Sequence, residues 1–78
     1  LPKSKKAYLY QANKGKSEEQ ILKIFNSAHP GHDNLKCQLG WYKGMPVWEV
    51  TYHKKNGNYG YVLYNFKNGK ELAYADNL

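Results

Sequence analysis

Two histidines and an aspartate lie close together in the segment His29-Pro30-Gly31-His32-Asp33, and these side chains are common metal ligands. Structural zinc sites, however, place their ligands in two regularly spaced pairs, and this sequence has no cysteine pair and no second histidine pair. A histidine at a helix end can instead contact the terminal carbonyl groups. The pattern therefore favours a structural role for His29 and His32 and predicts no metal site and no cofactor.

The single cysteine, Cys37, excludes an internal disulfide and is a candidate nucleophile. A Cys/His pair with His29, His32 or His53 is conceivable, but no recognised catalytic motif surrounds Cys37. The cysteine lies in the alternating segment Leu35–Tyr42, at a position where a small buried apolar side chain would serve. A packing role is therefore preferred over a catalytic one.

Two further patterns suggest chemistry only weakly. Glu49 is a candidate for an acid pair, with Glu71 on the same sheet face or with Asp76, but 78 residues leave little room for a water-excluding pocket. Gly15-Lys16-Ser17 resembles the end of a phosphate-binding loop, yet Tyr10 stands where such a loop requires an earlier glycine. We expect no enzymatic activity and no small-molecule substrate.

The elements that position these residues begin with a helix over Ser17–Ala28. Ser17 is the expected N-cap, and Gln20 completes a capping box. Ile21, Ile24 and Phe25 follow helical spacing and form the apolar stripe. Pro30-Gly31 ends the helix.

Two Asn-Gly steps, Asn56-Gly57 and Asn68-Gly69, predict the turns of an antiparallel meander. The expected strands are Ala7–Ala12, Leu35–Tyr42, Val47–His53, Tyr59–Phe66 and Lys70–Tyr74. Asp33-Asn34 and Lys43-Gly44 are read as turns. The sequence thus predicts an α+β domain, with one amphipathic helix packed on an antiparallel sheet of four to five strands.

If both Asn-Gly steps are two-residue loops, Val50 faces Leu63 and Leu63 faces Tyr74. Because side chains alternate along a strand, two faces follow. The expected core face carries Trp48, Val50, Tyr52, Tyr61, Leu63, Leu72 and Tyr74, with Asn65 as a polar exception. The expected outer face carries Val47, Glu49, Thr51, Val62, Tyr64, Phe66, Glu71 and Ala73, of which Val47, Glu49, Val62, Tyr64 and Phe66 form the candidate partner-binding face.

The net charge of +6 comes from a chain whose twelve basic residues are all lysine. Aromatic side chains flanked by lysines can stack on single-stranded nucleic acid, so a small basic nucleic-acid-binding domain is the alternative function. Arginine, which gives bidentate contacts to phosphates and bases, is absent, and no RNA-recognition motif is present. A protein partner is therefore favoured.

Five short segments form a recognisable set: Ser17–Ile21, His29–Gly31, Pro46–Tyr52, Tyr59–Val62 and Phe66–Lys70. Together they resemble the corresponding segments of PepSY-like domains, in particular the C-terminal domain of TseB-like cell wall elongation regulators of Gram-positive bacteria. The similarity spans about Gly15 to Tyr74, which is most of the chain.

The resemblance implies a cystatin-like, non-catalytic binding or regulatory module, with a peptidase or a penicillin-binding protein as its partner. It also implies an extracytoplasmic location. We expect residues 1–78 to be a single domain excised from a longer membrane-anchored protein, whose membrane helix lies outside this sequence.

Overall fold

The computed structural model describes residues 15–54 and 57–75. Its helix, α2, spans Glu18–Ala28 and begins at the predicted N-cap, Ser17. The capping box is confirmed: the Gln20 amide donates to Ser17 Oγ at 3.2 Å, and the Ser17 amide donates to Gln20 Oε1 at 3.0 Å. Glu18 and Glu19 lie in the first turn, where negative charge stabilises the positive end of the helix dipole.

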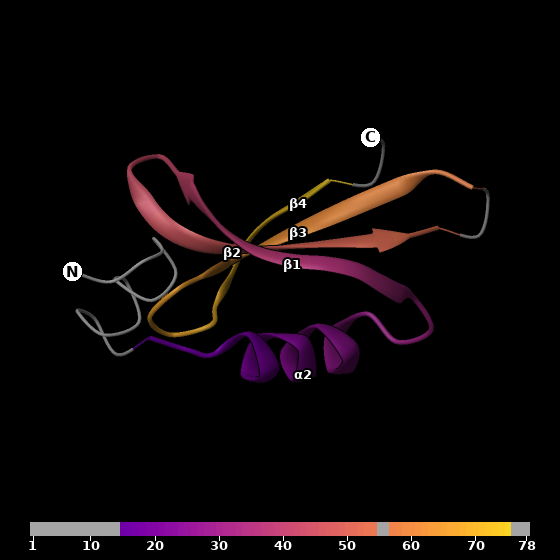
Figure 1. Ribbon diagram of the computed structural model, residues 1–78, viewed down its shortest axis with the longest axis horizontal. Coiled ribbons are helices and arrows are strands. Elements are labelled where there is room, and N and C mark those ends of the chain that lie inside the picture. The colour runs from indigo at the N-terminus through magenta and orange to yellow at the C-terminus, as the bar shows by residue number, and fades with distance from the viewer. Residues whose placement is uncertain (1–14, 55–56, 76–78) are drawn as a thin grey trace.

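The described strands form a four-stranded antiparallel sheet in the order β1-β2-β3-β4, with α2 along one side (Figure 1). The strands are β1 (Asp33–Tyr42), β2 (Met45–His53), β3 (Tyr59–Asn65) and β4 (Glu71–Ala75). This arrangement confirms the predicted α+β fold with one helix on an antiparallel sheet. The predicted strand at 7–12 lies outside the described residues, and the turn predicted at Asp33-Asn34 is wrong because β1 already includes both residues.

The connection between β1 and β2 is the turn predicted at Lys43-Gly44. Both residues have positive φ, 50° at Lys43 and 79° at Gly44, as a two-residue type I′ turn requires. Tyr42 faces Met45 across this turn, and Trp41 faces Pro46.

The predicted register between β2 and β3 is wrong by one residue. Val50 faces Val62 rather than Leu63, and Trp48 faces Tyr64. The physical reason is the turn: the Lys54 amide donates to the Asn58 carbonyl at 2.8 Å, so Lys54 and Asn58 flank a loop one residue longer than expected. Gly57, at φ +88°, provides the left-handed residue that closes such a three-residue loop as well.

The second Asn-Gly step also closes a longer loop than predicted. The Asn65 amide donates to the Lys70 carbonyl at 2.8 Å, and the Gly69 amide donates to the Asn65 carbonyl at 2.9 Å. Gly69 has φ +73°. Phe66 therefore belongs to the loop rather than to β3. A register shift opposite Leu63 and Tyr64 then pairs Leu63 with Ala73.

The core lies between α2 and the sheet face that carries Trp48, Val50 and Tyr52, as predicted for β2. A one-residue slip moves every side chain of a strand to the other face. The β3 residues in the core are consequently Val62 and Tyr64 instead of Tyr61 and Leu63. The buried cluster comprises Ile21, Phe25, Trp48, Val50, Tyr52, Val62, Tyr64 and Phe66.

Candidate functional site

The five residues predicted to form a partner-binding face do not share an exposed surface. Val62, Tyr64 and Phe66 have 0% of their surface exposed and pack in the core beneath α2. Val47 and Glu49 remain on the opposite face, where Val47 is also 0% exposed and Glu49 is half-buried. The burial of Val62 and Tyr64 follows from the observed β2–β3 register, which differs by one residue from the predicted register. It also removes the aromatic stacking platform on which the nucleic-acid alternative depended.

Glu49 and Glu71 do not form an acid pair, because they lie on opposite faces of the sheet. Glu49 faces Leu63 on the outer face, and a Cβ at Gly40 would collide with its carboxylate. Glu71 faces Tyr64 and approaches the helix side, where it contacts His29. The expectation that both carboxylates share the outer face is therefore wrong. The alternative partner of Glu49, Asp76, lies outside the described residues.

The neighbouring histidines take separate partners. His29 Nε2 lies 3.0 Å from Glu71 Oε1, whereas the His32 ring packs against Tyr52 with the ring centroids 4.6 Å apart. Among the described residues, no group of three His, Cys, Asp or Glu side chains could hold a metal ion. His29 is the C-cap of α2, the terminal position that its sequence context suggested.

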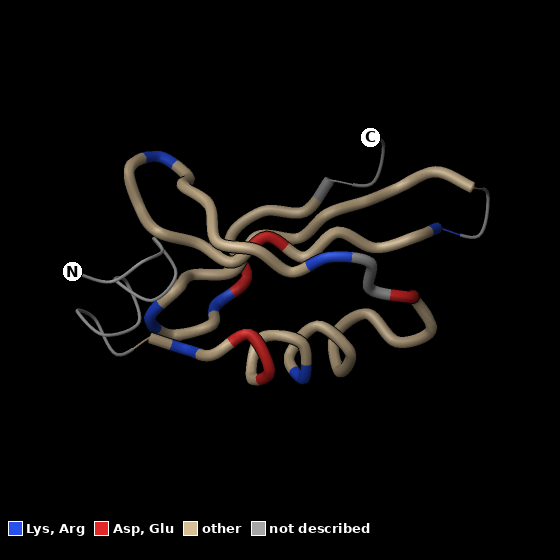
Figure 2. The backbone as a smooth tube through the Cα atoms, in the orientation of Figure 1, with Lys and Arg blue, Asp and Glu red and all other residues tan. Residues whose placement is uncertain are grey.

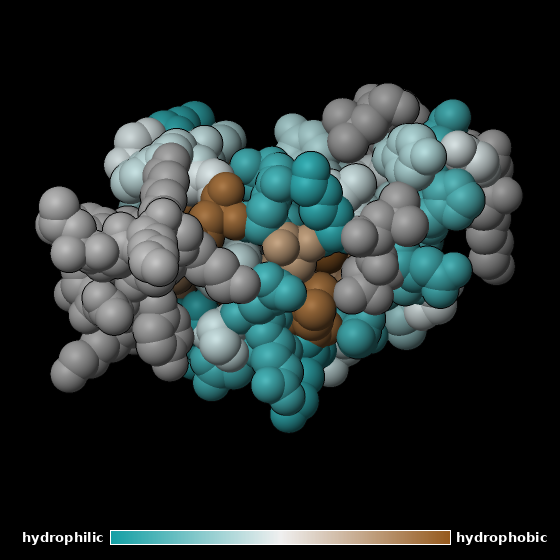
Figure 3. All heavy atoms as spheres, viewed as in Figure 1, coloured by the Kyte–Doolittle hydropathy of each residue, from teal (hydrophilic) through white to brown (hydrophobic). Residues whose placement is uncertain are grey.

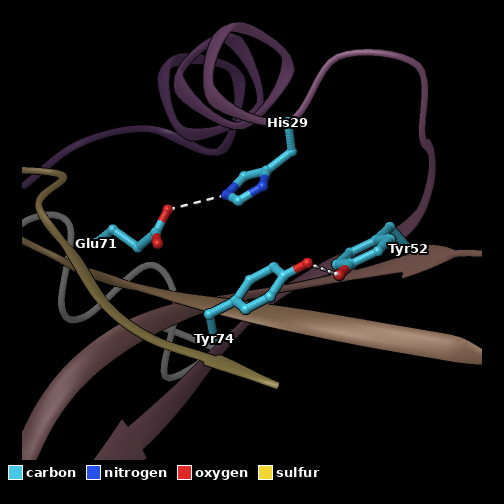
Figure 4. A network of polar contacts seen from close by, with 4 residues as sticks. All are labelled: His29, Tyr52, Glu71 and Tyr74. Atoms are coloured by element: carbon cyan, nitrogen blue, oxygen red, sulfur yellow. Dashed lines mark hydrogen bonds and ion pairs between the residues drawn. The ribbon is translucent and has the colours of Figure 1, made fainter. Parts of the chain in front are cut away.

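A small polar cluster joins the C-terminal end of α2 to β4 and β2 (Figure 4). Besides contacting Glu71, the His29 ring stacks on Tyr74 with centroids 5.2 Å apart and an angle of 6°. The Tyr52 hydroxyl donates to the Tyr74 hydroxyl at 3.0 Å. This geometry links the helix end to the edge strand, and its contacts are those of a structural clamp.

Tyr64 carries a buried hydroxyl that has no hydrogen-bond partner among the described residues. Burial, together with the nearby charges of Glu71 and Cys37, raises the pKa of Tyr64 to about 12. A neutral, inaccessible phenol is poorly suited to act as a general acid or base at neutral pH.

Cys37 is partly buried on β1 and packs against the core, opposite Val50. This position fits the packing role expected from the alternation of its strand. Leu39, two residues further along β1, packs against the same cluster.

Among the described residues, the large apolar side chains that reach the surface lie outside the predicted partner-binding face. They are Trp41 at 51%, Met45 at 36%, Tyr59 at 47% and Tyr74 at 47% exposed. In Figure 3, hydrophobic atoms on the face in view form small separate patches among hydrophilic side chains, one of them where α2 meets the sheet. Trp41 and Met45 flank the Lys43-Gly44 turn, and we name residues Trp41–Met45 the hairpin tip. The sequence signal for this surface was a Trp and a Met on either side of a two-residue turn.

The fold and these contacts define a small α+β module in which His29, Glu71 and Tyr74 tie the helix end to the sheet. Residues 15–75 match the PepSY family, described as the peptidase propeptide and YPEB domain. The chain belongs to this family. Neither the curated proteins nor the solved structures yielded a match.

Family membership supports several of the expectations from sequence. PepSY domains are generally propeptide or regulatory modules of peptidases, are generally non-catalytic and bind peptidases or other proteins. They are typically extracellular or periplasmic. In the described part of the chain, no helix has the length and hydropathy needed for a membrane span.

Proposed function

We propose that this protein is a non-catalytic extracytoplasmic regulator that acts by binding and restraining a partner, either a peptidase or a protein of cell wall synthesis such as a penicillin-binding protein. The observation that carries the proposal is the family match over residues 15–75, which covers nearly all of the described chain. The geometry of the candidate acid pair is in keeping with it, since Glu49 and Glu71 lie on opposite faces of the sheet and Glu71 contacts His29.

The resemblance to TseB-like regulators is the reason for proposing a protein of cell wall synthesis as one of the two alternative partners. In that case residues 1–78 are a single domain of a longer membrane-anchored protein in a Gram-positive envelope. In the other alternative, the partner is a secreted or membrane-anchored peptidase that contacts the domain outside the cytoplasm. Both alternatives require a protein-binding surface and no cofactor.

The test is a titration of purified zinc, serine, cysteine and aspartic endopeptidases with the full chain, using a fluorogenic peptide substrate. Binding to the extracellular part of a purified penicillin-binding protein is measured in parallel. We expect saturable inhibition of one peptidase class, or saturable binding to the penicillin-binding protein, that survives 0.5 M salt.

An unrelated lysine-rich protein of similar net charge serves as the control, because non-specific electrostatic attraction is screened by salt. The proposal is wrong if the chain neither inhibits any of these peptidases nor binds the penicillin-binding protein. Cleavage of the peptide by the chain itself would contradict the non-catalytic part of the proposal.

A further inference from the structure

We propose that the hairpin tip, Trp41–Met45, is the surface that contacts the partner, and that it enters a concave apolar site with an acidic rim on that protein. This inference rests on the proposed function. It replaces the partner-binding face expected on the sheet, whose β3 and loop residues are buried.

The strand register makes the hairpin tip project from the body of the domain. The last residue of β3, Asn65, faces Val47, so the ends of β1 and β2 continue beyond β3. Figure 1 shows the β1–β2 hairpin curving away from α2 at this end of the sheet. A projecting hairpin matches a concave site better than a flat one.

The tip is held in one conformation by its turn. Lys43 and Gly44 adopt the positive φ angles of a type I′ turn, and the cross-strand pairs Trp41–Pro46 and Tyr42–Met45 extend the ladder up to it. A surface that is already ordered loses little conformational entropy on binding. Little of the free energy of the contacts is therefore offset by ordering the hairpin on binding.

The composition of the tip is that of an interface centre. Trp41 is 51% exposed and Met45 is 36% exposed, although both are large apolar side chains. Trp, Tyr and Met are enriched in protein interfaces, and Trp is prominent among the residues that contribute most to binding. The partner site that accommodates these side chains must be apolar.

The charge around the tip specifies the rim of that site. The Lys43 ammonium lies 5.4 Å from the centroid of the Tyr42 ring, so a cation is held at the turn itself. The β3–β4 loop, which carries Lys67, joins the same end of the sheet through a hydrogen bond from the Phe66 amide to the Pro46 carbonyl. Figure 2 shows lysine at the tip and also along the β3–β4 loop, which lies on the α2 side of the same sheet end. An acidic rim complements this distribution.

The remaining exposed aromatic residues provide a comparison. Tyr59 lies at the other end of the sheet, beside the 54–58 connection. Its ring centroid lies 5.3 Å from that of His53. Its exposure of 47% is close to that of Trp41, at 51%. Tyr59 is therefore a matched control for the loss of one exposed aromatic side chain.

The experiment measures the affinity of each variant for whichever peptidase or penicillin-binding protein binds the wild-type chain. Trp41→Ser combined with Met45→Ser should weaken binding at least about tenfold, because it removes one large apolar side chain from each face of the tip. Lys43→Asn should weaken it several-fold at low salt and less at high salt, since Asn-Gly keeps the type I′ turn while removing the charge. Tyr59→Ser should bind within about twofold of wild type.

Circular dichroism and the thermal midpoint show whether each variant is folded. If the double variant is unfolded, the affinity of Lys43→Asn decides the test. The inference is overturned if the tip variants bind as tightly as wild type, or if Tyr59→Ser loses as much affinity as they do. The proposed function survives both results. If the wild-type chain has no partner in the panel, the proposed function and the inference fall together.

Discussion

At the scale of single residues, the hydroxyl of Tyr64 shows how burial sets chemistry. It is enclosed in the core without a partner among the described residues. Removing an unsatisfied buried hydroxyl removes a desolvation cost. We therefore expect Tyr64→Phe to leave the free energy of unfolding unchanged or to raise it by up to about 1 kcal/mol, as measured by urea denaturation at pH 7.

The same substitution should change the response to alkaline pH. The pKa of Tyr64 is raised by burial from 10.0 to about 12, so between these values the folded state holds a proton that the unfolded chain has released. This contribution to stability is complete below pH 10 and is lost as the pH rises towards 12. In Tyr64→Phe, the free energy of unfolding should fall less steeply over that range than in wild type. Equal slopes would show that Tyr64 ionises normally.

Lys43 occupies a backbone conformation that suits another residue better. Its φ of 50° lies in the left-handed region, which Asn adopts more readily than Lys. Lys43→Asn creates the Asn-Gly pair preferred in type I′ turns. We expect a gain of about 0.5 kcal/mol in the free energy of unfolding, measured by urea titration. Lys43→Val, which disfavours positive φ, should lower it and serves as the opposite control.

At the scale of elements, the helix start was the most predictable feature, because a capping box is a local pattern of side-chain and backbone bonds. Ser17→Ala removes the acceptor for the Gln20 amide, which the structure places at 3.2 Å. The free energy of unfolding should fall by about 1 kcal/mol, and Ser17→Asp should retain most of it. Thermal unfolding of the three proteins measures this. A loss in Ser17→Asp equal to that in Ser17→Ala would contradict the capping role.

The turns were only half predictable for a physical reason. Gly57 and Gly69 do adopt the positive φ that Asn-Gly steps indicate, so the hairpins were expected correctly. The length of each loop is a different question, because a left-handed glycine also occurs in hairpin loops longer than two residues. Only the hydrogen bonds that join Lys54 to Asn58 and Asn65 to Lys70 reveal where the strands begin to pair.

The error in loop length also produced the error in the predicted partner-binding face. The alternation of β3 was correct, yet its phase relative to β2 was inverted, which placed Tyr64 outside and Tyr61 inside. Asn65 marks the error in retrospect. A polar residue assigned to the core face is half-exposed at the end of β3, where its side chain caps the following turn by accepting from the Lys67 amide at 2.8 Å.

At the scale of the whole molecule, the register decides which surface a partner can reach. With Val62, Tyr64 and Phe66 enclosed beneath α2, the exposed apolar surface shifts towards the hairpin tip and a few separate tyrosines. In the proposed function, the domain restrains its partner through such exposed surface. The proposal for the hairpin tip depends on this register.

The most direct test of the register compares two equal deletions on one strand, Tyr64→Ala and Tyr61→Ala, by urea unfolding of the full chain. The structure buries Tyr64 completely and leaves Tyr61 half-buried on the other face. Tyr64→Ala should cost about 3–5 kcal/mol and Tyr61→Ala no more than about 1–2 kcal/mol. A larger loss for Tyr61→Ala than for Tyr64→Ala would contradict the register and return the partner-binding surface to the sheet.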